Sequence, residues 1–304
     1  MKIVIAGGTG FIGNKLVRAL TKNKCSVILL TRKRTLGNNI TSSVRTVQWD
    51  AINTGEWANE LNNADAIINL SGESLASGRW TAERKNLIVQ SRIQSTRAIV
   101  EAISRVKNKP PVLLNASAVG YYGNVPDARV TEDTIKGRDF LAETCYLWEK
   151  EAQEAHSFRV RVVLLRTGLV LGKEGGVLTK FLTPFKMFIG GPLGSGKQWL
   201  PWIHQDDLIK AIIFIIHTQT MSGPVNLTAP KPVTMKEFSK LLGETLRKPS
   251  IMRVPSFILK MILGEMSEMV LSGQNAIPKK LLQAGFEFQC LNLRDALQDI
   301  IAGK

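Results

Sequence analysis

Short apolar runs alternate with longer amphipathic stretches along the first half of the chain. The apolar runs predict β-strands at residues 3–6, 27–30, 44–48, 66–70, 112–116 and 160–165. Apolar residues at helical spacing predict helices at residues 11–21, 81–105 and 140–155. Strands that alternate with helices build parallel sheets, so we predict an α/β protein with a Rossmann-type, doubly wound parallel sheet.

The pattern changes after Gly172. Residues 173–201 contain six glycines and three prolines around an apolar, helix-like patch at 178–189. This composition is typical of a lid or substrate loop rather than of a scaffold layer. From Thr234 onward the pattern is mostly helical and rich in Met and Leu.

A further helix and strand are expected between these two regions. Asp206 or Asp207 is expected to cap a helix that runs to Ile216, and residues 225–227 are typical of a short strand. We therefore predict a dinucleotide-binding domain and a smaller, mainly helical C-terminal domain that includes the lid. The first comprises residues 1–172 and 202–229, and the second comprises residues 173–201 and 230–304.

The first predicted strand leads directly into a glycine-rich turn, GGTGFIG at residues 7–13. In such turns one glycine allows the tight bend, one lets the backbone approach a pyrophosphate, and one lets the helix pack on the sheet. The positive end of the following helix then faces the phosphates. The residues predicted to bind a dinucleotide here are Gly7, Thr9, Gly10, Phe11, Ile12 and Gly13.

The end of the second predicted strand indicates which dinucleotide is bound. NAD-binding proteins usually carry an acid about 20 residues after the turn, which binds the ribose 2′-hydroxyl. Here the strand ends in Leu30, Thr31 and Arg32, and no acid follows directly. A hydroxyl and a guanidinium can bind a 2′-phosphate, which an acid would repel. Thr31 and Arg32 therefore predict NADP (NADPH), with a basic surface turn as the alternative.

The chain is strongly basic, with 40 Lys and Arg against 25 Asp and Glu and a formal net charge of +15. Such an excess can indicate nucleic-acid binding. The charges are dispersed, however, and the densest cluster, residues 32–34, holds three of them without an aromatic neighbour. We therefore expect an anionic small-molecule substrate and no nucleic-acid partner.

The cysteines and the apolar stretches bear on location. Cys25, Cys145 and Cys290 lie far apart and fit neither a disulfide framework nor a zinc site, so we expect no metal. No apolar stretch approaches the roughly 20 residues of a membrane span, and the N-terminus enters a strand without a leader. These features predict a cytoplasmic protein with no membrane partner.

Several motifs together point to a known family. They are GGTGFIG at 7–13, LSGES at 70–74, RTGLVLG at 166–172, GGPLGSGKQWLPWIH at 190–204 and LLQAGFEF at 281–288. Over almost its whole length the chain resembles the extended short-chain dehydrogenase/reductase superfamily. More specifically, it resembles an atypical epimerase-family branch, NAD-dependent epimerase/dehydratase-like and also labelled cell-division-inhibitor-like.

The resemblance implies further cofactor contacts beyond the glycine turn. The residues that it implies are Thr31, Arg32, Asp50, Leu70, Ser71, Gly72, Arg92 and Val170. Thr31 and Arg32 would hold the adenosine 2′-phosphate, Arg92 would reach a phosphate or ribose, and Val170 would line the nicotinamide end. From the residues alone, Asp50 is equally well a turn residue, and Arg92 a solvated helix charge.

Ordinary members of the superfamily use a Tyr-x-x-x-Lys motif on the helix after the fifth strand, with the tyrosine as acid and base. Tyr146 and Lys150 match this spacing, but their register argues against them. Glu149 resembles the Glu that relatives carry four residues after the lysine. This alignment places the lysine position at Cys145 and the tyrosine position at Leu141, and leaves Tyr146 and Lys150 as surface residues.

The Ser or Thr that completes the usual triad would fall at Ala118. All three usual groups are then missing, and other residues have to be considered. The remaining catalytic candidates are Ser117, Tyr122 and His204, together with Tyr121 and Glu73. The alternatives are packing for the tyrosines, a structural cap for Glu73, and hydrogen bonding at a helix entry for His204.

Two functions are compatible with these residues. The first is an NADP(H)-dependent oxidoreductase or epimerase that acts on a nucleotide-sugar-like or carbonyl substrate, bound between the sheet edge and residues 173–201. The second is a non-catalytic NADP(H)-binding regulator or redox sensor that acts on a protein partner.

Overall fold

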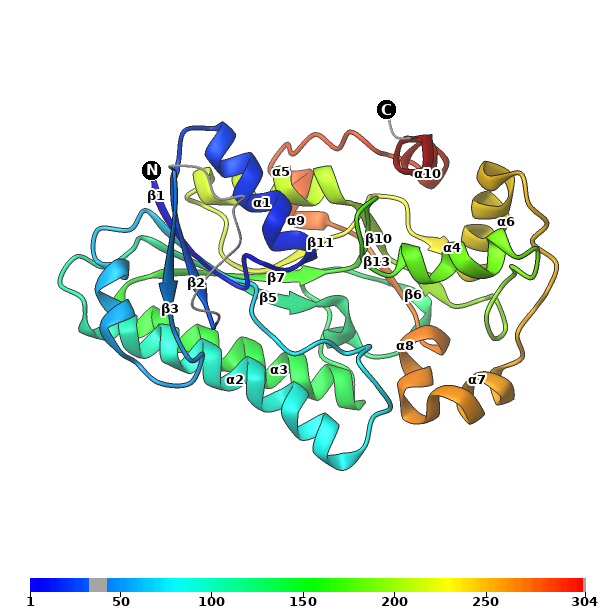
Figure 1. Cartoon of the computed structure of the whole chain (residues 1–304), viewed down its shortest axis with the longest axis horizontal. Helices are drawn as coiled ribbons and strands as arrows, with labels where there is room; N and C mark the ends of the chain where they lie inside the picture. The colour runs from blue at the N-terminus through cyan, green and yellow to red at the C-terminus, as the bar shows by residue number, and fades with distance from the viewer. Residues whose placement is uncertain (33–42, 303–304) are drawn as a thin grey trace.

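The computed structural model describes residues 1–32 and 43–302, so Lys33 and Arg34 of the basic cluster lie outside the described residues. Within this part of the chain, seven parallel strands form the central sheet. They are β1 (Lys2–Ala6), β2 (Ser26–Thr31), β3 (Val44–Gln48), β4 (Ala66–Asn69), β5 (Val112–Ala118), β7 (Arg161–Thr167) and β11 (Gly223–Leu227). Their spatial order is β3-β2-β1-β4-β5-β7-β11, so β2 and β3 are added on one side of β1 and the later strands on its other side (Figure 1). The predicted Rossmann-type α/β fold is confirmed.

Helices cover both faces of this sheet (Figure 1). The helices α1 (Phe11–Lys22) and α5 (Gln205–His217) lie on one face, and α2 (Ala82–Arg105) and α3 (Phe140–Gln153) lie on the other. The residues of each strand alternate between the two faces. In β1, Ile3 and Ile5 join the core under α1 and α5, whereas Val4 and Ala6 join the core under α2 and α3. Burial on both faces explains why the inner strands β1, β2 and β4 are almost continuously apolar, whereas the edge strand β3 is only partly buried.

Smaller elements extend the molecule beyond the carboxyl edge of the sheet. Three two-stranded sheets pair β8 (Leu169–Leu171) with β10 (Trp202–His204), β9 (Trp199–Leu200) with β12 (Val233–Thr234), and β6 (Val125–Val130) with β13 (Gln274–Ala276), among the described residues. The further helices are α4 (Leu178–Lys186), α6 (Met235–Leu246), α7 (Ser256–Leu263), α8 (Glu268–Leu271), α9 (Lys279–Gln283) and α10 (Leu293–Ala302). Phe185, Trp202, Phe238 and Leu297 belong to their shared core.

The start of α5 differs from the expectation. The helix α5 begins at Gln205, and its N-cap is His204, whose Nδ1 accepts a hydrogen bond from the Asp206 N–H at 3.2 Å. The expectation that Asp206 or Asp207 caps this helix is therefore wrong, because β10 runs into the helix without an intervening loop. The strand β6 lies within the range predicted for the dinucleotide-binding domain. It pairs with β13, which comes from the C-terminal part of the chain.

Asp207 instead fastens the C-terminal segment to the sheet domain. Its carboxylate is fully buried and accepts hydrogen bonds from the N–H groups of Gln289, at 2.8 Å, and Cys290, at 2.9 Å. In the part of the chain that the structure covers, no helix has the length and apolar character to cross a membrane.

The substitution Asp207→Asn is expected to destabilise the fold by about 1–3 kcal/mol, because an amide offers one acceptor oxygen to two buried N–H donors. Urea unfolding followed by tryptophan fluorescence measures the change. The control is Asp206→Asn, whose carboxylate is half exposed beside Lys15 and whose loss is expected to cost less than about 1 kcal/mol. Equal effects of the two substitutions would contradict the assigned role of Asp207.

Candidate functional site

A cavity of about 500 Å³, the first cavity, opens at the carboxyl edge of the sheet. The glycine turn lines it, together with residues that end or follow β2, β3 and β4. The predicted cofactor residues that line it are Gly7, Thr9, Gly10, Thr31, Arg32, Asp50, Leu70, Ser71 and Gly72. Ligands of open parallel sheets bind at this edge.

The glycine turn leaves no room for a side chain at Gly7 or Gly13. Gly7 has a φ of +76°, and a Cβ there would lie 2.6 Å from the carbonyl carbon of Leu70. A Cβ on Gly13 would lie 2.4 Å from the carbonyl oxygen of Gly7. Gly10 is the N-cap of α1, and neither a capping side chain nor an acid occupies the first turn of this helix. The helix N-terminus therefore presents its N–H groups and partial positive charge to a bound anion.

Asp50 forms the turn after β3 and also lines the first cavity. Its carboxylate accepts hydrogen bonds from the N–H groups of Asn53 and Ile52, at 2.8 Å each. The side-chain amide of Asn53 adds a third hydrogen bond at 2.7 Å. These contacts lower the pKa of Asp50, with the Asn53 N–H as the largest cause. Asp50 is thus a turn residue whose turn forms part of the cavity wall.

The segment after β4 is held in place by Asn69, which is fully buried. Its amide nitrogen donates to Asn115 Oδ1 at 2.7 Å and to Thr96 Oγ1 at 3.0 Å. Its amide oxygen accepts hydrogen bonds from the N–H and the hydroxyl of Ser71. This arrangement fixes the backbone at Leu70 and Ser71, which form one side of the first cavity.

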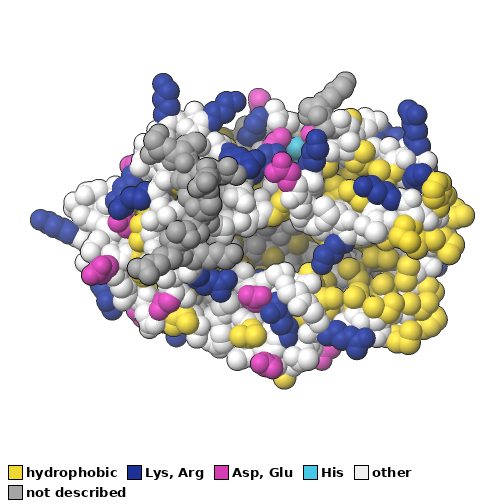
Figure 2. Space-filling model, viewed as in Figure 1, with side chains coloured by type: hydrophobic (Ala, Val, Ile, Leu, Met, Phe, Trp, Pro, Cys, Tyr) yellow, Lys and Arg dark blue, Asp and Glu magenta, His cyan; other side chains and the backbone are white. Residues whose placement is uncertain are grey.

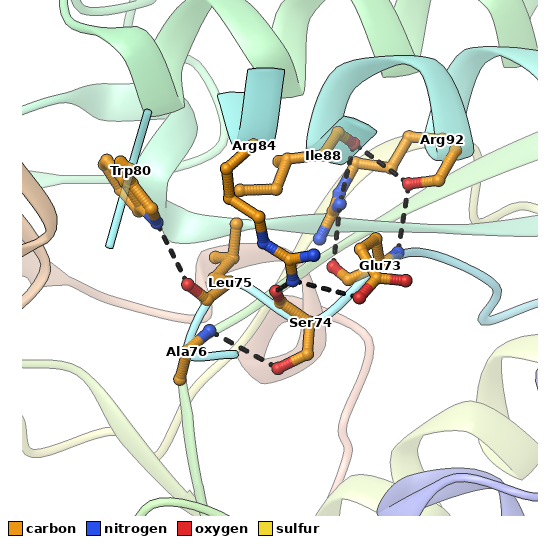
Figure 3. Close-up of polar contacts among 9 residues, drawn as sticks. Glu73, Ser74, Leu75, Ala76, Trp80, Arg84, Ile88 and Arg92 are labelled. Atoms are coloured by element: carbon orange, nitrogen blue, oxygen red, sulfur yellow. Dashed lines mark hydrogen bonds and ion pairs between the residues drawn. The ribbon is translucent and has the colours of Figure 1, made fainter. Parts of the chain in front are cut away.

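Two arginines of α2 hold the next stretch of chain, Glu73–Ser74 (Figure 3). Arg84 donates to Glu73 Oε1 at 2.9 Å and to the Ser74 carbonyl at 2.5 Å. Arg92 donates through Nη1 to the carbonyls of Glu73, at 3.0 Å, and Ile88, at 2.8 Å. The Glu73 carboxylate is therefore engaged in an ion pair on the cavity wall.

A second cavity of about 210 Å³ lies along the same edge, at the ends of β5 and β7. Side chains of α3 form one wall, residues 199–201 form another, and α8 contributes Glu268 and Met269. Arg92 also lines it and stacks over the ring of Trp148, 5.0 Å from the ring centroid. Within the described residues, its lining carries one cation, Arg92, and one anion, Glu268.

The residues at the usual catalytic positions all face this second cavity. Ala118, Leu141 and Cys145 line it, and burial raises the pKa of the Cys145 thiol to about 12. Tyr146 is 38% exposed, and the Lys136 ammonium lies 4.9 Å from the centroid of its ring. Neither Tyr146 nor Lys150 lines the second cavity.

Two of the other catalytic candidates belong to a buried network at the end of the sheet. Arg166 on β7 and Glu149 on α3 form a two-pronged ion pair with N–O distances of 2.8 Å. Ser117 donates its hydroxyl proton to Glu149 Oε1 at 2.6 Å. Tyr122 donates to Asn226 Oδ1 at 2.6 Å, and burial raises its pKa to about 12. Both hydroxyl groups therefore have structural partners.

The remaining predicted residues lie outside the first cavity. Ile12 and Val170 pack against the core of the sheet. The carbonyl of Phe11 accepts a hydrogen bond from Gln205 Nε2 at 2.9 Å, which ties the glycine turn to α5. His204 is buried, its Nε2 lies 3.2 Å from the Asp299 carboxylate, and it lines neither cavity.

The first cavity is also lined by Trp49, Ser91 and Gln94, which were not predicted from the sequence. Ser91 and Gln94 are three residues apart on α2 and so share a face of the helix. Polar residues at this spacing beside Arg92 were the available signal. Trp49 had no comparable signal, because its position follows from the turn that Asp50 makes.

The sheet, the glycine turn and the cavity at the strand ends define a dinucleotide-binding α/β protein. A model of the NAD-dependent epimerase/dehydratase family matches residues 3–227, and a domain of unknown function matches residues 254–300. The chain belongs to the NAD-dependent epimerase/dehydratase family, as an NAD(P)-binding member. The predicted family resemblance is confirmed.

Relatives are similar along the whole chain. The epimerase family protein YfhF of Bacillus subtilis is 40% identical, over 100% of this chain and 99% of the relative. The epimerase family protein SAR0825 of Staphylococcus aureus is 41% identical, over 98% of each. The structure of the human epimerase family protein SDR39U1 with NADPH is 30% identical and covers 100% of both chains, with a TM-score of 0.90.

The substitution Glu149→Gln is expected to destabilise the protein by about 3–5 kcal/mol, because it leaves Arg166 as a buried cation without a counter-charge. Chemical unfolding measures the loss. Glu151→Gln on the same helix removes the exposed pair with Arg97 and serves as the control, with an expected cost below about 1 kcal/mol. A small effect at Glu149 would show that the network is dispensable.

Proposed function

We propose that the protein is an NADP(H)-dependent oxidoreductase that acts on a small, mainly apolar carbonyl compound in the second cavity. The observation that carries the proposal is the junction of the two cavities. Gly72 lines the first, Arg92 lines the second, and a Cβ on Gly72 would lie 3.3 Å from the guanidinium carbon of Arg92. A dinucleotide with its adenosine and pyrophosphate in the first cavity would therefore extend its nicotinamide toward the second.

The choice of NADP(H) rests on the end of β2. Arg32 is exposed on the rim of the first cavity, next to Thr31, where a 2′-phosphate would lie. The guanidinium can form charge-assisted hydrogen bonds with a phosphate. The human relative was solved with NADPH, which supports the same choice.

The second cavity favours a carbonyl compound over a nucleotide sugar, and so favours a less charged substrate than the anionic one expected from the net charge. Its volume of about 210 Å³ is smaller than the roughly 300–1,000 Å³ of sites for drug-sized ligands. A sugar nucleotide carries a diphosphate that several cations usually neutralise, whereas the described lining offers Arg92 alone. Leu141, Leu169 and Met269 provide apolar contacts for a small substrate instead.

The nicotinamide would supply or accept the hydride when bound. Leu141 and Cys145 occupy the places of the usual tyrosine and lysine. The residues of the second cavity would therefore position and shield the reacting groups, but neither Leu141 nor Cys145 would donate a proton to the substrate. The hydroxyl groups of Thr144 and Thr167 donate to the backbone carbonyls of Phe140 and Leu165, so their protons are engaged. The hydroxyl of Ser272, which also lines the second cavity, or a water would then supply the proton. Carbonyl compounds whose reduced form is a stabilised anion, such as quinones, should react faster than simple ketones.

The lack of a hydroxyl at Ala118 and Leu141 also supports a second candidate function, that of a non-catalytic NADP(H)-binding regulator. Aliphatic side chains at Ala118 and Leu141 preserve the cofactor pocket without the usual acid. This candidate predicts tight NADPH binding and no turnover of any small carbonyl compound.

The preference for NADPH is expected to depend on Arg32. Arg32→Ala should weaken NADPH binding by about tenfold or more, through loss of a charge-assisted contact, and leave NADH binding unchanged. Fluorescence titration with both nucleotides measures this. Arg18→Ala, an exposed arginine on α1, is the control and should change neither affinity. Equal affinity of the unmodified protein for NADH and NADPH would contradict the proposal.

Turnover is expected to be independent of Tyr146. The assay follows the loss of NADPH absorbance with a panel of quinones, ketones and sugar nucleotides, and it should identify quinone-type acceptors. Tyr146→Phe should keep the rate within about twofold, because this phenol points away from the second cavity. A severe loss in Tyr146→Phe would show that the phenol takes part in the reaction. No turnover of any acceptor, with NADPH binding intact, would favour the regulator.

A further inference from the structure

Exposed apolar side chains gather at the end of the molecule that carries α4, α6 and α7 (Figures 1 and 2). Eight large apolar residues there are between 50% and 78% exposed, in the part of the chain that is described. They are Met187, Phe188, Ile189, Ile251, Met252, Phe257, Met261 and Ile262. We call this set the α4–α7 face.

Two segments distant in the sequence form this face, and backbone contacts join them. The Met252 N–H donates to the Gly190 carbonyl at 3.2 Å, and the Val254 N–H donates to the Pro192 carbonyl at 3.1 Å. A Cβ on Gly191 would lie 2.3 Å from the Met252 carbonyl oxygen, so the two segments are in close contact.

The helix α7 is fixed to the rest of the molecule. Arg79 donates to the carbonyls of Ile262 and Met261 at 3.0 Å each, and Lys85 pairs with Glu265 at 2.6 Å. Phe257 and Met261 lie one turn apart on α7, and both are more than two thirds exposed. The apolar side chains of Phe257 and Met261 therefore lie on a helix whose position is fixed by these contacts.

The segments that form the face are also basic. Residues 178–189 and 245–263 contain six Lys or Arg and no Asp or Glu. The ammonium of Lys248 lies 3.6 Å from the centroid of the Phe188 ring, so cationic and apolar groups are interleaved. The whole chain carries a net charge of +15, which adds to the attraction for an anionic partner.

We propose that the α4–α7 face docks on the surface of an anionic lipid membrane. Large apolar side chains with lysines and arginines among them are the composition of elements that lie at the boundary between headgroups and acyl chains. The apolar groups would enter this boundary, and the cations would bind phosphate headgroups. The expectation of no membrane partner rested on the lack of a spanning segment, and a contact at the membrane surface needs none.

A second copy of the chain is a poorer occupant of the face. A two-fold contact would set the same patch against itself and so bring cations such as Lys248 and Lys260 toward like charges, without an acid in either segment to offset them. The face is also distinct from the proposed substrate site, since none of its eight residues lines the first or the second cavity.

Co-sedimentation with vesicles tests this proposal on the full chain. The protein should bind vesicles of phosphatidylcholine mixed with phosphatidylglycerol at low salt, bind pure phosphatidylcholine at least about tenfold more weakly, and dissociate as salt is raised. Phe257→Ser combined with Met261→Ser should lower the partition coefficient by about tenfold or more. The control is Ile135→Ser, which removes a side chain that is 85% exposed outside the face and should change nothing.

A charge variant gives an independent test. Lys186→Glu combined with Lys260→Glu should weaken binding by about tenfold or more, whereas Arg105→Glu combined with Lys107→Glu, exposed but outside the face, should weaken it less. Thermal unfolding and NADPH titration show that each variant is folded. No binding to anionic vesicles, or equal binding by parent and face variants, would overturn the proposal. A dimer in light scattering that the Phe257 and Met261 substitutions dissociate would assign the face to a second copy and overturn it too.

Discussion

The buried ion pair between Glu149 and Arg166 is the contact on which the end of the sheet depends. It joins α3 to β7, and it takes up the hydroxyl of Ser117 at the end of β5. Through Tyr122 and Asn226 the same network reaches β11 and the carbonyl of Ile277 in the C-terminal segment. A buried charge without this partner would cost several kcal/mol, so the pair fixes α3 in one orientation.

That orientation decides which side chains of α3 line the second cavity. Cys145 lies one turn before Glu149 on α3, and Leu141 lies one turn before Cys145, so all three share a side of the helix. Glu149 faces the network, and the other two face the cavity. Tyr146 points elsewhere, since it lies about 100° around the helix from Cys145 and about 140° from Leu141, and it is 38% exposed. Tyr146 and Lys150 lie five residues beyond the usual tyrosine and lysine positions at Leu141 and Cys145, and this difference in register leaves the second cavity without a tyrosine hydroxyl from α3.

Much of the fold could be predicted from local patterns. The strands β1 to β5 and the helices α1 to α3 follow from apolar periodicity, and the glycine turn follows from its spacing. The start of α5 was misjudged because Asp206 and Asp207 both resemble caps, while the contacts that occupy Asp207 come from residues more than 80 positions away. Contacts between residues so far apart in the chain cannot be predicted from the local sequence pattern. The network of Ser117 and Tyr122 and the assembly of the α4–α7 face escaped prediction for the same reason.

The central claim is that NADP(H) lies across both cavities, with its nicotinamide against the side of α3 that bears Leu141 and Cys145. A crystal structure with NADPH tests it most directly. The claim predicts the 2′-phosphate within hydrogen-bond distance of the Arg32 guanidinium, the pyrophosphate at the N-terminus of α1, and nicotinamide C4 in the second cavity with no tyrosine hydroxyl in reach. A nicotinamide outside the second cavity, or a tyrosine hydroxyl hydrogen-bonded beside C4, would contradict it.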